Sequence, residues 1–433
     1  MENLFITLKI ISDLKKIILD YLTKNQKILL NRELKNINTG EIIRYDPKLM
    51  IIFIEKLNMH SVFEKCAKYG KLGNMKWLLK NGFSYDEKTF ALAALNGNLD
   101  SMKWLYSKRF PCDTLTFSSA AKNGNLGNMK WLLENKFPYD SFTFSSAAEN
   151  GNLENMEWLF KNKFPYDDKT FTWAALNGKL ENMKWLLENN FSRDRLTFAN
   201  AAKNGNLENM KWLLANKFPY DELVFSFAIQ NGNLQNIKWL LENKFPYNEF
   251  VFEDAAKNGN LENMKWLLEN KFPRSEDTFL YAVENGNLEN MKWLLENKFS
   301  FCSDTFNVAA DYGNLENMKW LLENKCFYDK ELFEYAAFNG NLENMKWLLE
   351  NKFPYDELVF ANAACKGNLE NLKWLLSNNF PYNEKTFKEA IKTGRIEIIK
   401  WLLENKFPYD KKVGKKLDKY KLLIKREKIK KIF

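Results

Sequence analysis

Residues that could carry catalysis or hold a metal ion are few in this 433-residue chain. The only histidine is His60, so no second histidine is available for a metal site or for a Ser-His-Asp or Cys-His pairing elsewhere. Five cysteines occur without any C-x-x-C spacing: Cys66, Cys112, Cys302, Cys326 and Cys365. We interpret them as incidental, reduced thiols of an intracellular protein.

Carboxylates are abundant, but they recur at a fixed spacing instead of clustering. Examples 27 residues apart are Glu262, Glu289, Glu316 and Glu343. A set of near-identical sites does not make one active site, and the glycines form neither a G-x-G-x-x-G nor a P-loop string. The sequence therefore predicts no enzyme, no cofactor and no metal.

The chain is dominated by one 27-residue repeat. Thirteen copies follow without insertion, each starting at a glycine: Gly70, Gly97, Gly124, Gly151, Gly178, Gly205, Gly232, Gly259, Gly286, Gly313, Gly340, Gly367 and Gly394. Self-similarity at a fixed period of this length indicates a stacked solenoid, in which each unit needs its neighbour to bury an apolar face.

Each repeat predicts two short helices. In the copy that starts at Gly340, an apolar stripe of Leu342, Met345, Leu348 and Leu349 predicts the first, called helix B. The link FPYD stops this helix, and Asp356 is the expected N-cap of a second, helix A. Helix A presents one buried face, formed by Phe360, Ala363 and Ala364. Its terminal Asn-Gly reverses the chain, because glycine accepts the left-handed conformation.

Thirteen of the fourteen tryptophans form one column of the repeat. Trp347 lies at the edge of the helix B stripe, where it could pack on the tryptophan of the adjacent copy. The alternative is an aromatic platform for a ligand.

The string AAKNGNLENMKWLLENK resembles ankyrin repeats, with an alanine pair, a polar-glycine turn and a leucine-rich second helix, over about 350 residues. Ankyrin units run to about 33 residues, and the shortening here falls where their β-hairpin finger would be. The T-P-L-H segment is also absent, with Phe360 in place of its leucine. The resemblance implies that the helix stack carries over without the finger. The Asn-, Lys- and Phe-rich copies are similar to ankyrin-type proteins of amoeba-infecting giant viruses.

Two flanks frame the repeats. Residues 1–58 are expected to form a helical cap; the segment LKKIILDYLTKNQKILLNRELKN also faintly resembles an F-box, which would imply a substrate adaptor for a ubiquitin ligase. The solenoid is assigned to 59–410. The tail, 411–433, has eleven Lys and Arg against Asp418 and Glu427, so its net charge of +9 equals that of the whole chain.

The tail has an apolar stripe of Val413, Leu417, Tyr420 and Ile424 beneath a cationic face, which suits a terminal cap. The alternatives are nuclear import, an anionic membrane surface or nucleic acid. The first sixty residues carry a net +3, which leaves −3 for the repeats. Nucleic acid is therefore disfavoured, since the solenoid offers no basic track for a phosphate backbone. No stretch approaches the about 20 apolar residues of a membrane span.

Recognition is expected where the repeat varies, and two positions directly after the helix A phenylalanine vary most. The second is aromatic in four alternate copies, 54 residues apart, at Trp173, Phe227, Tyr281 and Tyr335. Rings about 20 Å apart on one face, with Glu253, Asp254 and Glu334 between them, suit an extended protein or peptide. Duplication of a two-repeat unit, or aromatic side chains that only shield the groove, would explain the same pattern.

The sequence thus predicts an all-α fold: an α-solenoid of about thirteen two-helix, ankyrin-like repeats with shortened or absent β-hairpins. We expect a monomeric, non-enzymatic scaffold that binds a protein along helix A, the concave face in ankyrin stacks. A cytoplasmic location is expected, in the host cell if the protein is viral, with the nucleus as the alternative through the basic tail.

Overall fold

The computed structural model describes residues 62–80, 82–417 and 420, and this part of the chain is helical and without strands. Two helices form per repeat, as predicted. The odd-numbered helices are helix A, and the even-numbered ones are helix B. His60, the F-box-like segment and Ile424 lie outside the described residues.

The chain divides into two compact units, 1–231 and 232–433. The odd-numbered helices of the first are α5 (Val62–Lys68), α7 (Lys88–Asn96), α9 (Thr114–Asn123), α11 (Phe142–Asn150), α13 (Thr170–Asn177), α15 (Leu196–Asn204) and α17 (Leu223–Asn231). Those of the second are α19 (Val251–Asn258), α21 (Thr278–Asn285), α23 (Thr305–Tyr312), α25 (Leu332–Asn339), α27 (Leu358–Lys366) and α29 (Lys385–Thr393).

The even-numbered helices follow the same period. In the first unit they are α6 (Leu72–Lys80), α8 (Leu99–Ser107), α10 (Leu126–Glu134), α12 (Leu153–Lys161), α14 (Leu180–Glu188) and α16 (Leu207–Ala215). In the second they are α18 (Leu234–Glu242), α20 (Leu261–Glu269), α22 (Leu288–Glu296), α24 (Leu315–Glu323), α26 (Leu342–Glu350), α28 (Leu369–Ser377) and α30 (Ile396–Glu404).

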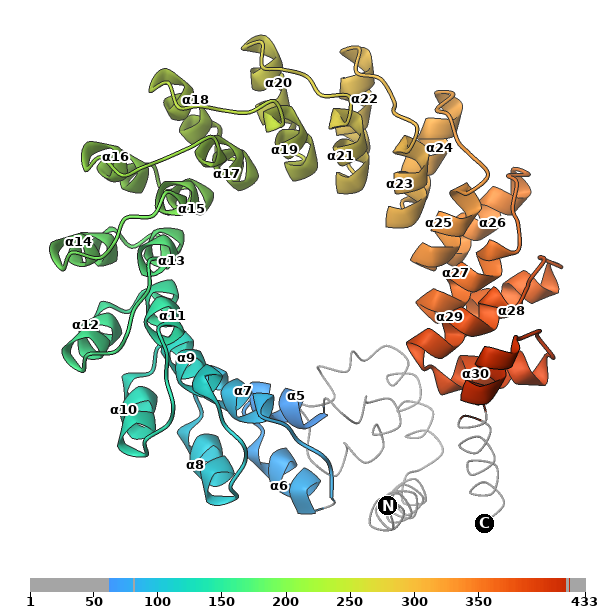
Figure 1. The fold of residues 1–433 in the computed structure, drawn as a ribbon. Helices are drawn as coiled ribbons and strands as arrows, with labels where there is room; N and C mark the ends of the chain where they lie inside the picture. The colour runs from blue at the N-terminus through green and yellow to red at the C-terminus, as the bar shows by residue number, and fades with distance from the viewer. Residues whose placement is uncertain (1–61, 81, 418–419, 421–433) are drawn as a thin grey trace, which may run out of the picture. The chain divides into compact units, whose positions relative to one another are not determined.

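Within each unit the odd-numbered helices pack side by side as one layer, and the even-numbered helices form a second layer outside them (Figure 1). The buried face of helix A is the predicted one, because Phe360, Ala363 and Ala364 are fully buried. The small alanine side chains allow neighbouring helices A to lie close together. On helix B, Met345 and Leu348 of the predicted apolar stripe are also fully buried.

The FPYD link replaces a hairpin finger with aromatic packing. Phe353 is buried, and its ring lies 5.6 Å from Trp347 and 5.9 Å from Phe306, which belongs to the copy that starts at Gly286, two copies earlier. Tyr355 stacks on Phe380 of the next repeat at 4.1 Å. Each tryptophan of the column therefore packs on its own repeat's link phenylalanine where one is present, in place of the expected tryptophan neighbour.

The expected N-cap at Asp356 is displaced by one residue. Helix α27 begins at Leu358 with Glu357 as its cap residue, whose side chain makes no capping hydrogen bond. Asp356 still accepts the Leu358 N–H through Oδ1 at 2.8 Å. The aspartate thus closes a short turn before the helix, which satisfies a free N–H group without being the boundary residue itself.

At the C-terminal end of the second unit, residues 411–417 are helical and bury Val413 and Leu417. This placement is compatible with the predicted terminal cap. Since most of the remaining tail lies outside the described residues, the role of 411–433 stays a prediction.

Candidate partner-binding surface

The two variable positions of helix A have different environments. The first is buried in most copies, where it faces the next repeat. Ser145 Oγ donates to Asp167 Oδ1 at 2.7 Å, and Asn307 Nδ2 donates to Asp329 Oδ2 at 3.1 Å. This position therefore joins neighbouring repeats, and its variation need not reflect a partner.

The second position is partly exposed in every copy except Ser146. One helical turn later, the residue after the alanine pair is also at least partly exposed. We call these two columns together the variable face. The first column runs through Leu92, Ser119, Ser146, Trp173, Asn200, Phe227, Asp254, Tyr281, Val308, Tyr335, Asn362 and Glu389. The second runs through Leu95, Lys122, Glu149, Leu176, Lys203, Gln230, Lys257, Glu284, Asp311, Phe338, Cys365 and Lys392.

The structure places the four predicted aromatic anchors on this face, two in each unit. Trp173 and Phe227 lie on α13 and α17, with α15 between them in the packed layer, and Tyr281 and Tyr335 lie on α21 and α25, with α23 between them. Each side chain is partly exposed, and Tyr335 is 36% exposed.

The three acidic residues predicted to bind a partner differ in their exposure to solvent. Glu253 is only 8% exposed, and its burial raises the pKa of its carboxyl, so it offers little surface. Asp254 and Glu334 are half-buried. Glu334 accepts a hydrogen bond from Asn362 Nδ2 at 3.1 Å. Burial raises its pKa to about 7, helped by the nearby Asp356.

Sequence reasoning missed the second column of the variable face, where several side chains contact the anchors. The Lys203 ammonium lies 5.3 Å from the Phe227 ring centroid, and Lys257 lies 5.5 Å from that of Tyr281. Lys257 also pairs with Glu284 at 3.1 Å. The helical period was the signal available, since a position three residues on lies on the same face.

A pocket of about 320 Å³ opens beside Tyr335 on the variable face. Its lining comes from α23, α25 and α27 and the residue before α25: Asp311, Glu331, Glu334, Tyr335, Phe338 and Asn362. Three carboxylates and two aromatic rings make this pocket suited to a cation.

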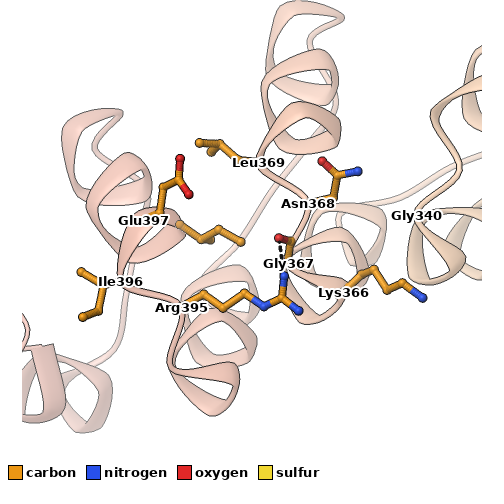
Figure 2. A pocket seen from close by; sticks show the side chains of 9 residues that line it. Gly340, Lys366, Gly367, Asn368, Leu369, Arg395, Ile396 and Glu397 are labelled. Atoms are coloured by element: carbon orange, nitrogen blue, oxygen red, sulfur yellow. Dashed lines mark hydrogen bonds between the residues drawn. The ribbon is translucent and has the colours of Figure 1, made fainter. Parts of the chain in front are cut away.

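A larger pocket, about 590 Å³, lies at the turns between α27 and α30, away from the variable face (Figure 2). Here Arg395 and Ile398 replace two asparagines of the repeat, and Arg395 Nη1 donates to the Gly367 carbonyl at 2.8 Å. Since the guanidinium already donates a hydrogen bond to the backbone, we attribute this pocket to the two substitutions in the repeat and do not assign a ligand to it.

Reactive thiols and metal binding are two further kinds of chemistry that bear on the described residues. Burial raises the pKa of Cys66 and of Cys326 to about 12, which makes these two thiols unreactive at neutral pH. The described part of the chain holds no cluster of three or more potential metal ligands. In the same residues, no helix has the length and apolar character needed to cross a membrane.

Comparisons with known proteins support the repeat architecture. A family model described as ankyrin repeats (3 copies) matches residues 171–250, 198–277, 252–332 and 332–413, which together span more than half of the chain. No curated protein matches. Among solved structures, the pentatricopeptide repeat protein PPR10 in complex with an 18-nt psaJ RNA element is 8% identical, with 90% of this chain and 76% of that chain covered and a TM-score of 0.32. PPR10 from maize is 9% identical, with 89% and 80% covered and a TM-score of 0.28. These two likenesses are too weak to bear on function.

Proposed function

Since this chain belongs to the ankyrin-repeat family, we propose that it is a non-enzymatic scaffold that binds a protein or peptide along the variable face. The observation that carries this proposal is the position of the aromatic residues that interrupt the strict repeat. Trp173, Phe227, Tyr281 and Tyr335 are partly exposed, and no aromatic ring of the described residues pairs with any of them.

This exposure contrasts with the aromatic columns that build the stack. Phe360 is fully buried, and Tyr355, although exposed, stacks on a neighbouring phenylalanine. Partly exposed aromatic side chains without such a structural partner are the residue types that most often anchor protein interfaces. Charge also favours a protein over a phosphate backbone, because residues 61–410 carry a net charge of −3.

The test is a binding measurement with two matched variants. In the face variant, Trp173, Phe227, Tyr281 and Tyr335 are changed to Ala; in the control, the exposed Phe142, Phe250 and Phe327 are changed to Ala. Proteins captured by the wild type from a cell extract are purified, and their affinity for each form is measured by calorimetry.

We expect the face variant to lose at least about 10-fold in affinity, because truncating an interface anchor typically costs more than 1 kcal/mol. The control should keep wild-type affinity, and circular dichroism should show equal helicity in all forms. Unchanged binding by the face variant, or equal losses in both variants, would place the partner elsewhere on the chain.

A further inference from the structure

The pocket beside Tyr335 has three carboxylates and no cationic side chain in its lining. Burial raises the pKa of Asp311, although Lys366 at the end of α27 is near enough for its charge to lower that pKa by a smaller amount. Asp311 from α23 and Glu331 and Glu334 next to Tyr335 supply three carboxylates around about 320 Å³. The repeats as a whole are nearly balanced in charge, so this pocket is a local exception. A cation that entered it would find carboxylates on one side and the rings of Tyr335 and Phe338 on the other.

Related positions in the same chain show which cation suits such a ring. Lys203 lies over Phe227, and Lys257 lies over Tyr281. In both cases the lysine stands 24 residues before the aromatic residue, at the end of the preceding helix A. The residue 24 positions before Tyr335 is Asp311. The chain thus supplies its own ammonium group at two of the four aromatic anchors. At the other two, Trp173 and Tyr335, it has a carboxylate in the equivalent position. Glu149, before Trp173, pairs with Lys122 at 2.7 Å, so a lysine of this chain already meets that carboxylate.

We propose that the Tyr335 pocket binds a lysine side chain of the protein partner, with the ammonium group against the Tyr335 ring and paired with Asp311 and Glu334. This assignment rests on the function proposed above and names the chemistry of the ligand. A lysine is preferred to other cations because two repeats of this chain place a lysine ammonium over the corresponding ring.

The charges around Glu334 add a pH dependence. The carboxyl faces Glu331, Lys330 and Tyr335 on or beside its own helix, Asp311 of α23, and Asp356 and Asn362 at α27. Burial and the neighbouring carboxylates raise its pKa to about 7, against the hydrogen bond from Asn362 and the charge of Lys330. An entering ammonium group favours the ionised form, so lysine binding should weaken as pH falls below about 7.

The test uses the full chain and a fluorescently labelled hexalysine peptide, with its fully Nε-acetylated form as the uncharged control. Affinity is measured by fluorescence anisotropy at about 150 mM salt, where long-range attraction between exposed charges is screened. Asp311→Lys supplies the missing lysine from within the chain. Glu343→Lys makes the same change in charge at an exposed position of α26, outside the variable face.

We expect the wild type to bind hexalysine and not its acetylated form. Asp311→Lys should weaken binding at least about 10-fold, and Glu343→Lys less than about 2-fold. Tyr335→Leu, which keeps every charge, should weaken binding about 3- to 10-fold. Lowering the pH from 8 to 6 should weaken wild-type binding, and Glu334→Gln should remove that dependence.

The proposal is overturned if the wild type does not bind hexalysine, if the acetylated peptide binds equally well, or if Asp311→Lys and Glu343→Lys have the same effect. Retained hexalysine affinity in the Tyr335→Leu variant would also overturn it. These results are separate from the proposed scaffold function: loss of partner binding in the four-alanine face variant would still support that function, with a different ligand chemistry at Tyr335.

Discussion

Asparagine side chains connect the repeats through the backbone of the preceding turn. Asn290 is fully buried on α22, and its Nδ2 donates to the Gly259 carbonyl at 2.8 Å. The same bond recurs 31 residues back in other copies, for example from Asn155 to Gly124. A buried carbonyl needs such a partner, so this bond gives a physical reason for the asparagine in the middle of NLENM.

One copy supplies a natural control for this bond. Lys179 stands at the N-cap of α14, where most other copies have an asparagine. Its Nζ donates a hydrogen bond to the Gly151 carbonyl at 2.8 Å, the carbonyl to which Asn182 would otherwise donate. The buried Nδ2 of Asn182 is then without a hydrogen-bond partner. Asn290→Ala should lower the free energy of unfolding by about 1–3 kcal/mol, because it leaves the Gly259 carbonyl unsatisfied. Asn182→Ala should cost much less, as measured by urea denaturation; equal losses would contradict this account.

The carboxyl of Glu334 should make the second unit's stability depend on pH. Its pKa is raised to about 7 in the folded protein from 4.5, so the stability it contributes is full below pH 4.5 and is lost as pH rises through 7. Glu334→Gln should therefore gain stability relative to the wild type between pH 5 and pH 8. Urea unfolding at the two values measures this, and a constant difference would show that the carboxyl titrates normally.

At the scale of the helix, every helix B after α6 is followed by a non-glycine residue in the left-handed conformation, which glycine adopts more easily. Lys352, just after α26, has φ 59°, and the equivalent position after α6 is Gly82, with φ 72°. A residue with a side chain pays about 1–2 kcal/mol to adopt this left-handed conformation. Glycine avoids that strain, but it loses more conformational entropy on folding, which costs about 0.5–1 kcal/mol.

Lys352→Gly should therefore raise the free energy of unfolding by up to about 1 kcal/mol. The matched change is Lys346→Gly, at an exposed position inside α26, which should lower it by about 1 kcal/mol. Thermal and urea denaturation of both variants give the comparison. A loss of stability in both would mean that lysine makes contacts at the helix end that outweigh the backbone strain.

One repeat shows how a helix pair adapts when its link changes. Cys326 stands where other copies have the link phenylalanine that packs beneath the tryptophan. Trp320 instead stacks on Phe279 with ring centroids 6.3 Å apart, and Phe301 contacts both rings. Trp320 thus packs on the helix A phenylalanine, Phe279, which the link phenylalanine contacts in other copies, as Phe407 contacts Phe360. Cys326 remains buried.

At the scale of the whole molecule, the contacts within each unit run mainly between adjacent repeats. A solenoid of this kind should tolerate the removal of one complete period. Deleting residues 97–123 joins Asn96 to Gly124 and so restores the Asn-Gly turn without removing an aromatic anchor. The variant should keep its helicity per residue in circular dichroism and its affinity for the partner.

The control deletion removes 97–110, about half a period, and joins helix A directly to the next helix A. It should lose helicity and aggregate, because the buried faces no longer meet. Equal behaviour of the two deletions would show that the period does not set the packing.

The sequence by itself determined the repeat, its two helices and their buried faces. The spacing of Phe360, Ala363 and Ala364 is local information, and so is the glycine that ends each helix A. The same information placed the four aromatic anchors on one face of their helices, since helical periodicity fixes the direction of a side chain.

Only the tertiary structure decided which variable positions are buried between repeats and which side chains surround each anchor. Glu253 and Glu334 occupy the same column, yet one is buried and the other lines a pocket. The pairing of Lys203 with Phe227, and the carboxylate of Asp311 beside Tyr335, arise from stacking residues 24 positions apart. Such contacts depend on the distance and rotation between neighbouring repeats, which a 27-residue period does not specify.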